Sequence, residues 1–172
     1  MNDTFTEKLA DGSTIHVRPI NRGDVERERA FVDGLSPESR HFRFLGGIGH
    51  LSESQLMRFC DIDLKHEMAF VALVQGKAGD TQVGVARYVA DPDNDEAEIA
   101  ISIADKYAGK GLDKLLLDHL IKYARDFGVT RLYSVELAAN AAIKKLMRAS
   151  GFRSARDPAD ATQVIYSLEL SG

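Results

Sequence analysis

The alternation of apolar and polar positions is clearest between residues 96 and 104. There Ile99, Ile101 and Ile103 alternate with small or polar residues. A period of two sends successive side chains to opposite faces of a strand. The segment therefore predicts a strand over Glu96–Ala104, with a branched apolar face directed at the core and a small polar face that carries Glu98.

The pattern becomes helical after this strand. Apolar residues recur at spacings of three and four between Leu112 and Phe127, and Gly128 follows as a typical helix stop. The segment predicts an amphipathic helix.

The loop between strand and helix, Asp105–Gly111, contains Gly109 and Gly111. Glycines let a ligand approach the backbone, while the first N–H groups of a helix are unpaired and its dipole attracts negative charge. Three lysines add positive charge around this turn: Lys106, Lys110 and Lys114. The loop therefore predicts a site for a phosphate or pyrophosphate. A plain strand-to-helix turn with solvated lysines is the structural alternative.

The other periodic segments complete a mixed α/β order. Further strands are predicted over Ser13–Ile20, Met68–Val74, Gln82–Val89, Arg131–Ala138 and Thr162–Leu170. Further helices are predicted over Arg22–Leu35, Ser36–Phe44, Ser52–Cys60 and Ala141–Ser150, the second and third with favourable capping residues. No repeat or long linker divides the chain. We expect a single domain over residues 1–172, with a mixed, mostly antiparallel sheet flanked by helices on both faces.

Composition limits the classes of function. Apolar residues make up 44% and charged residues 28% of the chain, which is typical of a globular protein. The net charge of −4 argues against a nucleic-acid binder. The chain has no apolar run long enough for a membrane span, and its first residues do not resemble a signal peptide. These absences favour a cytoplasmic location. The histidines and Cys60 show no metal-ligand spacing, so no metal site is predicted.

Two blocks of sequence resemble the GNAT family of N-acetyltransferases. Residues 107–112 are similar to the family's acyl-CoA loop, in which Gln or Arg is followed by two residues, Gly, one residue, and Gly or Ala. Gly111 takes the central position, whereas Ala108 and Asp113 replace the usual first and last residues. The second block, Asn140 to Phe152, matches the family's Asn…Leu-Tyr…Gly-Phe spacing, with Met147 in the Tyr position.

The resemblance extends over residues 81–152, and residues 17–40 also resemble bacterial protein-lysine acetyltransferases. It implies acetyl-CoA as co-substrate and direct transfer of an acetyl group to a primary amine, either of a protein lysine or of a small molecule. It further implies that the pantetheine arm pairs with backbone near Ile101 and Ile103. The implied cofactor-binding residues are Ile101, Ser102, Ile103, Ala108, Gly109, Lys110, Gly111, Leu112, Asp113 and Asn140. Asn140 also suits the N-cap of its helix.

An amine must lose a proton before it attacks a thioester, which requires a general base. Glu98 is our candidate, because it shares the small strand face with Ala100 and Ser102 and the resembling enzymes carry a glutamate there. Glu96, about 7 Å along the same face, is the fallback. Both could instead be solvated acids at a strand edge. Met147 stands where the family usually has a tyrosine beside the departing thiolate. A methionine side chain can only pack at this position, so that tyrosine is missing.

A non-catalytic acyl-CoA-binding sensor is the alternative function, and a pure interaction domain is a third. Asp113, Ala108 and Met147 favour the sensor. A carboxylate about 4 Å from a phosphate oxygen would cost about 4 kcal/mol at an effective dielectric near 20, unless Asp113 turns outward. The sequence predicts neither the acceptor nor the oligomeric state.

Overall fold

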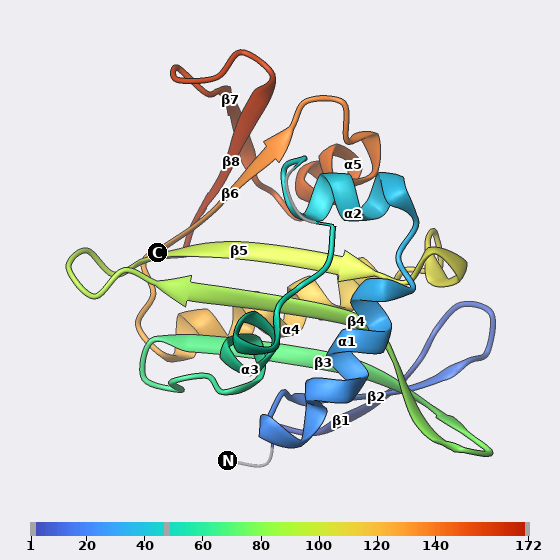
Figure 1. Ribbon diagram of the computed structural model, residues 1–172. Helices are drawn as coiled ribbons and strands as arrows, with labels where there is room; N and C mark the ends of the chain where they lie inside the picture. Colours follow the sequence, from blue (N-terminus) through green and yellow to red (C-terminus); the bar gives the residue numbers. More distant parts are fainter. Residues whose placement is uncertain (1–2, 47–48, 171–172) are drawn as a thin grey trace.

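The computed structural model describes residues 3–46 and 49–170, and its strands form one sheet in the order β1-β2-β3-β4-β5-β6-β8-β7 (Figure 1). The strands are β1 (Phe5–Lys8), β2 (Thr14–Pro19), β3 (Glu67–Gly76), β4 (Gly79–Ala90), β5 (Glu96–Ile103), β6 (Arg131–Leu137), β7 (Arg153–Arg156) and β8 (Gln163–Glu169). The helices are α1 (Val25–Asp33), α2 (Pro37–Arg43), α3 (Glu53–Cys60), α4 (Leu112–Asp126) and α5 (Ala141–Ala149), with short 3₁₀ turns η1 (Arg22–Asp24) and η2 (Asp105–Tyr107). The predicted mixed, mostly antiparallel sheet is confirmed.

The pairing of β5 with β6 is parallel, whereas every other neighbouring pair in the sheet is antiparallel. The parallel ladder covers only the start of each strand and ends at the pair Glu98 and Tyr133. Beyond this pair the two strands diverge (Figure 1). Meanwhile β5 stays paired with β4 as far as Ile103. The backbone of β5 therefore has a free edge on its β6 side.

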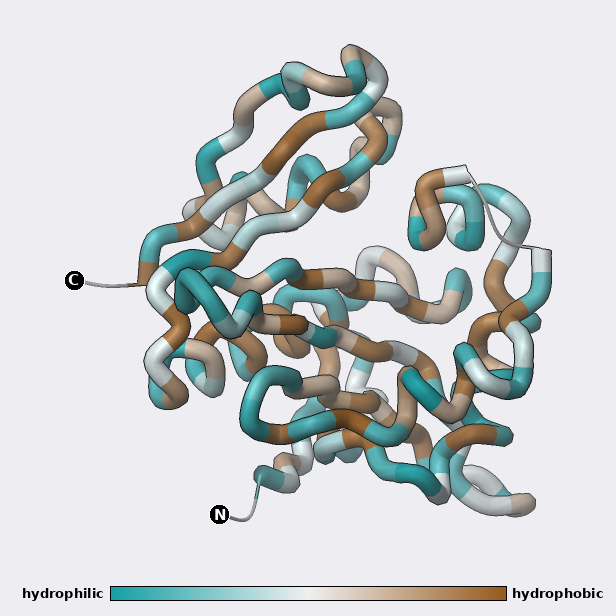
Figure 2. The backbone as a smooth tube through the Cα atoms, turned by 60° about the vertical axis from the view of Figure 1, so that its left-hand side comes forward, coloured by the Kyte–Doolittle hydropathy of each residue, from teal (hydrophilic) through white to brown (hydrophobic). Residues whose placement is uncertain are grey.

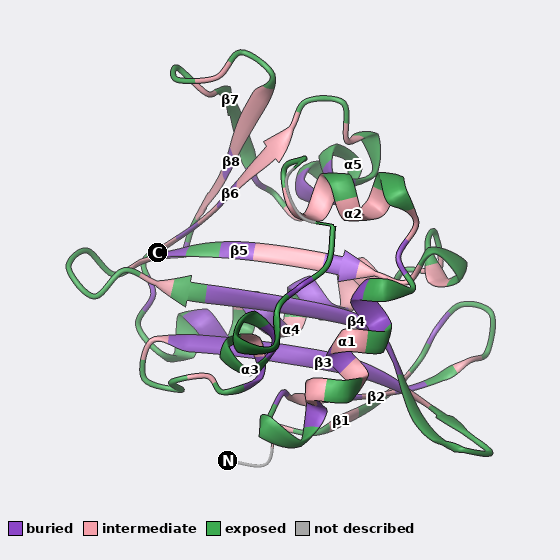
Figure 3. Cartoon of the chain, viewed as in Figure 1, coloured by how far each residue is buried: buried purple, intermediate pink, exposed green. Residues whose placement is uncertain are grey.

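Helices cover both faces of the sheet, as the sequence predicts. On one face α4 buries Leu112, Leu116, Leu117 and Leu120 completely in a core that also takes Ile99 from β5. On the other face α1 and α3 pack Phe31, Val32 and Leu56 against Val71 and Val85. The hydrophobic stretches follow these central elements, and the outer loops are mostly hydrophilic (Figure 2). β3 and β4 are buried along most of their length, whereas β7 is exposed (Figure 3).

Two strands were not predicted. β1 is a four-residue edge strand that pairs with β2, and β7 is a four-residue exposed edge strand that pairs with β8. Each is too short to carry a long alternating pattern, so the sequence does not indicate it. Pairing with a neighbouring strand of the sheet holds each of them extended. The predicted hairpin between β3 and β4 is confirmed, although its turn is tighter than the six-residue loop expected and lies between Gly76 and Gly79.

No helix among the described residues is long and apolar enough to cross a lipid bilayer. Gly46–His50, which the sequence suggests is a linker or a lip of the acceptor site, lies partly outside the described residues, at positions 47–48.

Candidate active site

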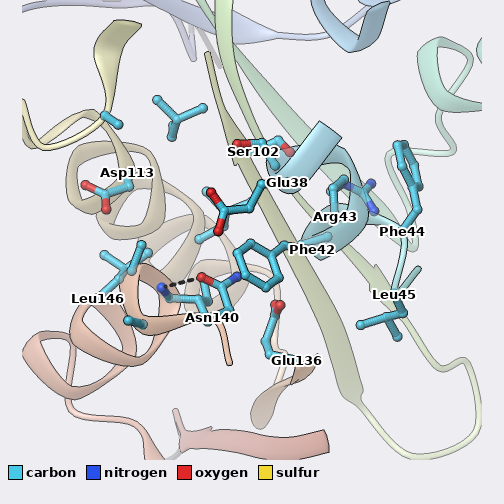
Figure 4. A pocket seen from close by; sticks show the side chains of 18 of the residues that line it. Glu38, Phe42, Arg43, Phe44, Leu45, Ser102, Asp113, Glu136, Asn140 and Leu146 are labelled. Carbon is cyan, nitrogen blue, oxygen red and sulfur yellow. Dashed lines mark hydrogen bonds between the residues drawn. The ribbon is translucent and has the colours of Figure 1, made fainter. Parts of the chain in front are cut away.

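A cavity of about 630 Å³ opens where β5 and β6 diverge (Figure 4). Its walls come from α2, β5, the loop around η2, the end of β6 and the start of α5. Most of the predicted site residues line it: Glu98, Ile101, Ser102, Ile103, Ala108, Gly109, Asp113 and Asn140. The fold thus brings the two sequence blocks, far apart in the chain, to one cavity.

Three predicted residues, Lys110, Gly111 and Leu112, do not line this cavity. Leu112 is fully buried and packs in the core beneath α4, so its side chain faces away from a ligand. Gly111 has a φ of 83°, in the left-handed region, and is the N-cap residue of α4 without a side-chain cap. Gly111 itself offers no side-chain acceptor to the first N–H groups of α4, and of these groups Lys114 N–H is bound by Asp113 Oδ1, which leaves the others for an anion.

Two of the three lysines around the loop form ion pairs with carboxylates, which reduces the positive charge that they offer to a ligand. Lys110 forms an ion pair with Asp11 of the β1–β2 turn, with Nζ and Oδ2 2.8 Å apart. The hydrogen bond from Lys110 holds the pKa of Asp11 below its usual range. Lys114 pairs with Asp118 one helical turn later, at 2.5 Å. Lys106 lies over the Tyr107 ring, 5.5 Å from its centre.

Asp113 lines the cavity, where Figure 4 shows its carboxylate beside α4. Its Oδ1 accepts a hydrogen bond from the backbone N–H of Lys114 at 2.8 Å. An acid in the first turn suits the helix dipole. Asp113 therefore borders the cavity with its carboxylate held against the first turn of α4.

Glu98 lies at the point where β5 and β6 part, and its side chain is exposed to the cavity. Among the described residues, no hydrogen bond or ion pair holds its carboxylate. Glu96 differs, because it pairs with Arg131 at 3.0 Å, and Arg131 also approaches Glu169 at 3.4 Å. This ion-pair chain joins three strands and gives Glu96 a structural role.

Sequence reasoning missed a second glutamate of the cavity, Glu136 on β6. It is partly buried, and its Oε1 accepts a hydrogen bond from Ser134 Oγ at 2.5 Å. Burial raises the pKa of Glu136 above its ordinary value, against the opposing effects of Ser134 and Arg43. A lone acid within an apolar strand was the available signal, but nothing local tells which cavity it faces.

α2, which the sequence predicts as a helix, forms another wall of the cavity. Its Glu38, Phe42 and Arg43 line the cavity. Asp105 of η2 fixes the start of the helix by accepting hydrogen bonds from Ser36 N (2.9 Å), Ser36 Oγ (2.8 Å) and Ser39 Oγ (2.7 Å).

Arg43 is the last residue of α2 and also lines the cavity. Its guanidinium lies over the rings of Phe44 and Phe59, at 5.0 and 5.9 Å. Burial and the nearby Arg87 lower the pKa of Arg43 to about 10. α2 therefore carries a partly desolvated cation beside the aromatic rings of Phe44 and Phe59.

The start of α5 matches expectation. Asn140 Oδ1 accepts a hydrogen bond from Ile143 N at 3.2 Å, so Asn140 is the N-cap residue. Met147 is fully buried in the core, as its apolar side chain requires.

Among the described residues, no cluster of three or more potential metal ligands occurs. Cys60 is buried and its thiol pKa is raised to about 12 by burial, so it is a poor nucleophile.

The family comparison agrees with this architecture. Residues 38–152 match the model of the acetyltransferase (GNAT) family. The chain belongs to the GNAT family. It is therefore an N-acetyltransferase with the family's fold.

The chain is similar to several acetyltransferases over four fifths of its length or more. The chain is 47% identical to "Acetyltransferase PA5475" of Pseudomonas aeruginosa over 98% of its own length and 90% of that protein. It superposes on the GNAT domain of S. lividans PAT with a TM-score of 0.88 and 28% identity, covering 97% of each chain. "Acetyltransferase Pat" of Mycolicibacterium smegmatis is 29% identical over 81% of this chain, which spans 41% of that protein.

Proposed function

We propose that this enzyme transfers an acetyl group from acetyl-CoA directly to the side-chain amine of a protein lysine, with Glu98 as the general base. The observation that carries the proposal is the exposed Glu98 carboxylate at the point where β5 and β6 separate. The likeness to the GNAT domain of PAT, a Streptomyces protein acetyltransferase, supports a protein acceptor. A small-molecule amine is the second candidate, because the cavity is also large enough for one.

The cavity fits acetyl-CoA in two respects. The β6-facing edge of β5 beyond Glu98 has no strand partner, so its backbone groups are free to pair with the amides of a pantetheine arm. The glycine-capped N-terminus of α4 offers backbone N–H groups to the pyrophosphate. Acetyl-CoA supplies the activated thioester.

Glu98 can supply the base that the acceptor amine needs. A lysine ammonium has a pKa near 10.4, so freeing its amine at pH 7 costs about 4–5 kcal/mol. A carboxylate at the cavity accepts that proton and attracts the cation beforehand. The neighbouring residue on the same face, Ala100, leaves space for the amine. Glu38 also lines the cavity, and its carboxylate favours a cationic acceptor as well.

The test compares Glu98→Gln with Glu96→Gln, two amide substitutions on the same strand. We expect Glu98→Gln to lower kcat by about 10²- to 10⁴-fold on a lysine peptide while acetyl-CoA affinity in calorimetry is unchanged. Glu96→Gln removes only the Arg131 ion pair and should keep kcat. Equal loss in both variants, or none in Glu98→Gln, would exclude Glu98 as the base.

The acceptor is tested separately with the wild-type protein. Lysine-containing proteins and peptides are compared with free amines at equal concentration, and acetylated products are identified by mass spectrometry. A higher kcat/KM for free amines than for every lysine peptide would favour the small-molecule acceptor.

A further inference from the structure

Helix α2 is held in the fold mainly by polar contacts. None of its seven residues is buried, whereas α1, α3, α4 and α5 each bury at least two residues. A helix without a buried apolar face gains little from the hydrophobic effect, and so short a helix is not stable by itself. The position of α2 therefore depends on its hydrogen bonds.

The carboxylate of Asp105 supplies the hydrogen bonds that join α2 to a distant part of the chain. Its Oδ1 accepts hydrogen bonds from Ser36 Oγ at 2.8 Å and from Ser39 Oγ at 2.7 Å. Its Oδ2 accepts one from Ser36 N at 2.9 Å. Among the described residues, the other hydrogen bonds of α2 stay within residues 33–49. Asp105 is thus the long-range anchor of this helix.

The anchor depends on the negative charge of Asp105. Desolvation raises the pKa of this carboxyl group, but the hydrogen bonds from Ser36 and Ser39 outweigh it and leave the pKa below its ordinary value. Hydrogen bonds to an ionised acceptor are stronger than those between neutral groups, and a carboxylate at the start of a helix also suits the helix dipole. An amide in the same place would therefore hold α2 more weakly.

Asp105 also begins the loop that leads to the N-terminus of α4, where the proposed function places the pyrophosphate. The pantetheine arm is placed on the free edge of β5, so α2 is a wall of the cavity that the donor does not need. Figure 4 shows the side chains of Glu38 and Phe42 pointing from α2 into the cavity. The carboxylate of Glu38 attracts a cationic amine, so the acceptor contacts the wall that Asp105 anchors.

We propose that Asp105 is a positioning residue for the acceptor: it holds α2 where the amine can bind between this helix and Glu98. The role rests on the proposed transfer to an amine. Asp105 acts through α2 and does not touch the reacting atoms. The acceptor wall is therefore fixed from the same loop that receives the donor, which places the two substrates relative to each other.

The kinetic test uses Asp105→Asn, which keeps the size of the side chain but replaces one acceptor oxygen by an N–H₂ group. The matched control is Asp160→Asn, because Asp160 also accepts three hydrogen bonds, from Thr162 N, Thr162 Oγ1 and Gln163 Nε2, and lies outside the cavity. We expect Asp105→Asn to raise KM for a lysine peptide about tenfold, with KM for acetyl-CoA unchanged. Asp160→Asn should change neither KM.

Ser39→Ala tests the same contact from the other side, because it removes one of the three hydrogen bonds and keeps the carboxylate. We expect a smaller rise in the acceptor KM, and no further rise when Ser39→Ala is added to Asp105→Asn. Fully additive effects would show that the two residues act separately and would overturn the proposal. An unchanged acceptor KM in Asp105→Asn, or an equal rise in both KM values, would also overturn it.

Hydrogen exchange measured by mass spectrometry tests the anchor without turnover. We expect the amides of residues 36–45 to exchange faster in Asp105→Asn and Ser39→Ala than in wild type, and at the wild-type rate in Asp160→Asn. Exchange at the wild-type rate in both anchor variants would overturn the proposal. No acetyl transfer by the wild-type enzyme to any amine would instead contradict the proposed function, and with it the role toward the acceptor, even if α2 exchanged faster in the variants.

Discussion

Gly111 and Gly128 stand at the two ends of α4 and share one backbone conformation, with φ of 83° and 82°. A Cβ atom on either would meet no other atom within 4 Å. Glycine is therefore required at both positions by the backbone and not by space. A side chain in this conformation costs about 1–2 kcal/mol wherever it is placed. The two residues differ in what lies beside them, since only Gly111 adjoins the proposed phosphate site.

This pair gives a controlled test of the loop. Gly111→Glu and Gly128→Glu should lose similar stability, but only Gly111→Glu brings a negative charge to the helix N-terminus. We expect calorimetric titration with acetyl-CoA to show micromolar binding by wild type and Gly128→Glu and none by Gly111→Glu. Equal affinity in the two variants would place the pyrophosphate elsewhere. No wild-type binding at millimolar acetyl-CoA would mean that Asp113 and Ala108 disable the site.

At the scale of elements, α5 both stabilises the fold and forms part of the cavity wall. Its apolar face packs through Ile143, Leu146 and Met147, while its first residues line the cavity. Asn140 caps the helix by its bond to Ile143 N. Its two expected roles, as a cap and as a cofactor contact, can therefore be separated by substitutions that keep only the first.

Asn140→Ala should destabilise the protein by about 1 kcal/mol in urea unfolding, because one N–H at the start of α5 loses its acceptor. Asn140→Ser keeps a capping oxygen and should recover most of that stability. If Asn140 also contacts acetyl-CoA, both variants should bind it more weakly than wild type. A Ser variant as unstable as the Ala variant would contradict the capping role, and unchanged affinity in both would contradict the contact.

At the scale of the whole molecule, Asp24 joins segments that precede the cavity wall. It is fully buried and accepts hydrogen bonds from Arg18 of β2 at 2.7 Å and from Arg27 of α1 at 2.9 Å. Burial alone would raise the pKa of Asp24, but the hydrogen bonds, from Arg18 first, outweigh it and leave the pKa lowered. The ionised form is therefore the one that the fold stabilises.

Asp24→Asn should cost about 3 kcal/mol at pH 7, toward the low end for a buried ion pair because both arginines are partly exposed. A lowered pKa stabilises the fold above the unfolded value, near 3.9, and that stability is lost as pH falls through the folded value. Urea unfolding should therefore show the gap between wild type and variant shrinking below about pH 4. A gap that is constant with pH would contradict the linkage.

The local chemistry of the chain determined most of the elements. The alternating isoleucines of β5, the leucine spacing of α4 and the capping box of Ser52 and Gln55 are all confirmed. Each depends on interactions within a few residues, which the order of the residues fixes. The resemblance of two short blocks likewise identified the family correctly. The four-residue edge strands β1 and β7 were not predicted, because pairing with a neighbouring strand, and not their own residues, holds them extended.

Only the tertiary structure decided which charges meet in the cavity and which neutralise one another. Lys110 is paired by Asp11, α2 is fixed by Asp105, and Glu136 is brought to the same cavity as Glu98. The partners in each case are remote in the sequence, and a charge acts through distance and burial, which no local pattern contains. The sequence by itself thus determined the helices, most strands and the loop with its glycines. The opening between β5 and β6, which brings the two glutamates together, follows from how far two strands pair before they diverge.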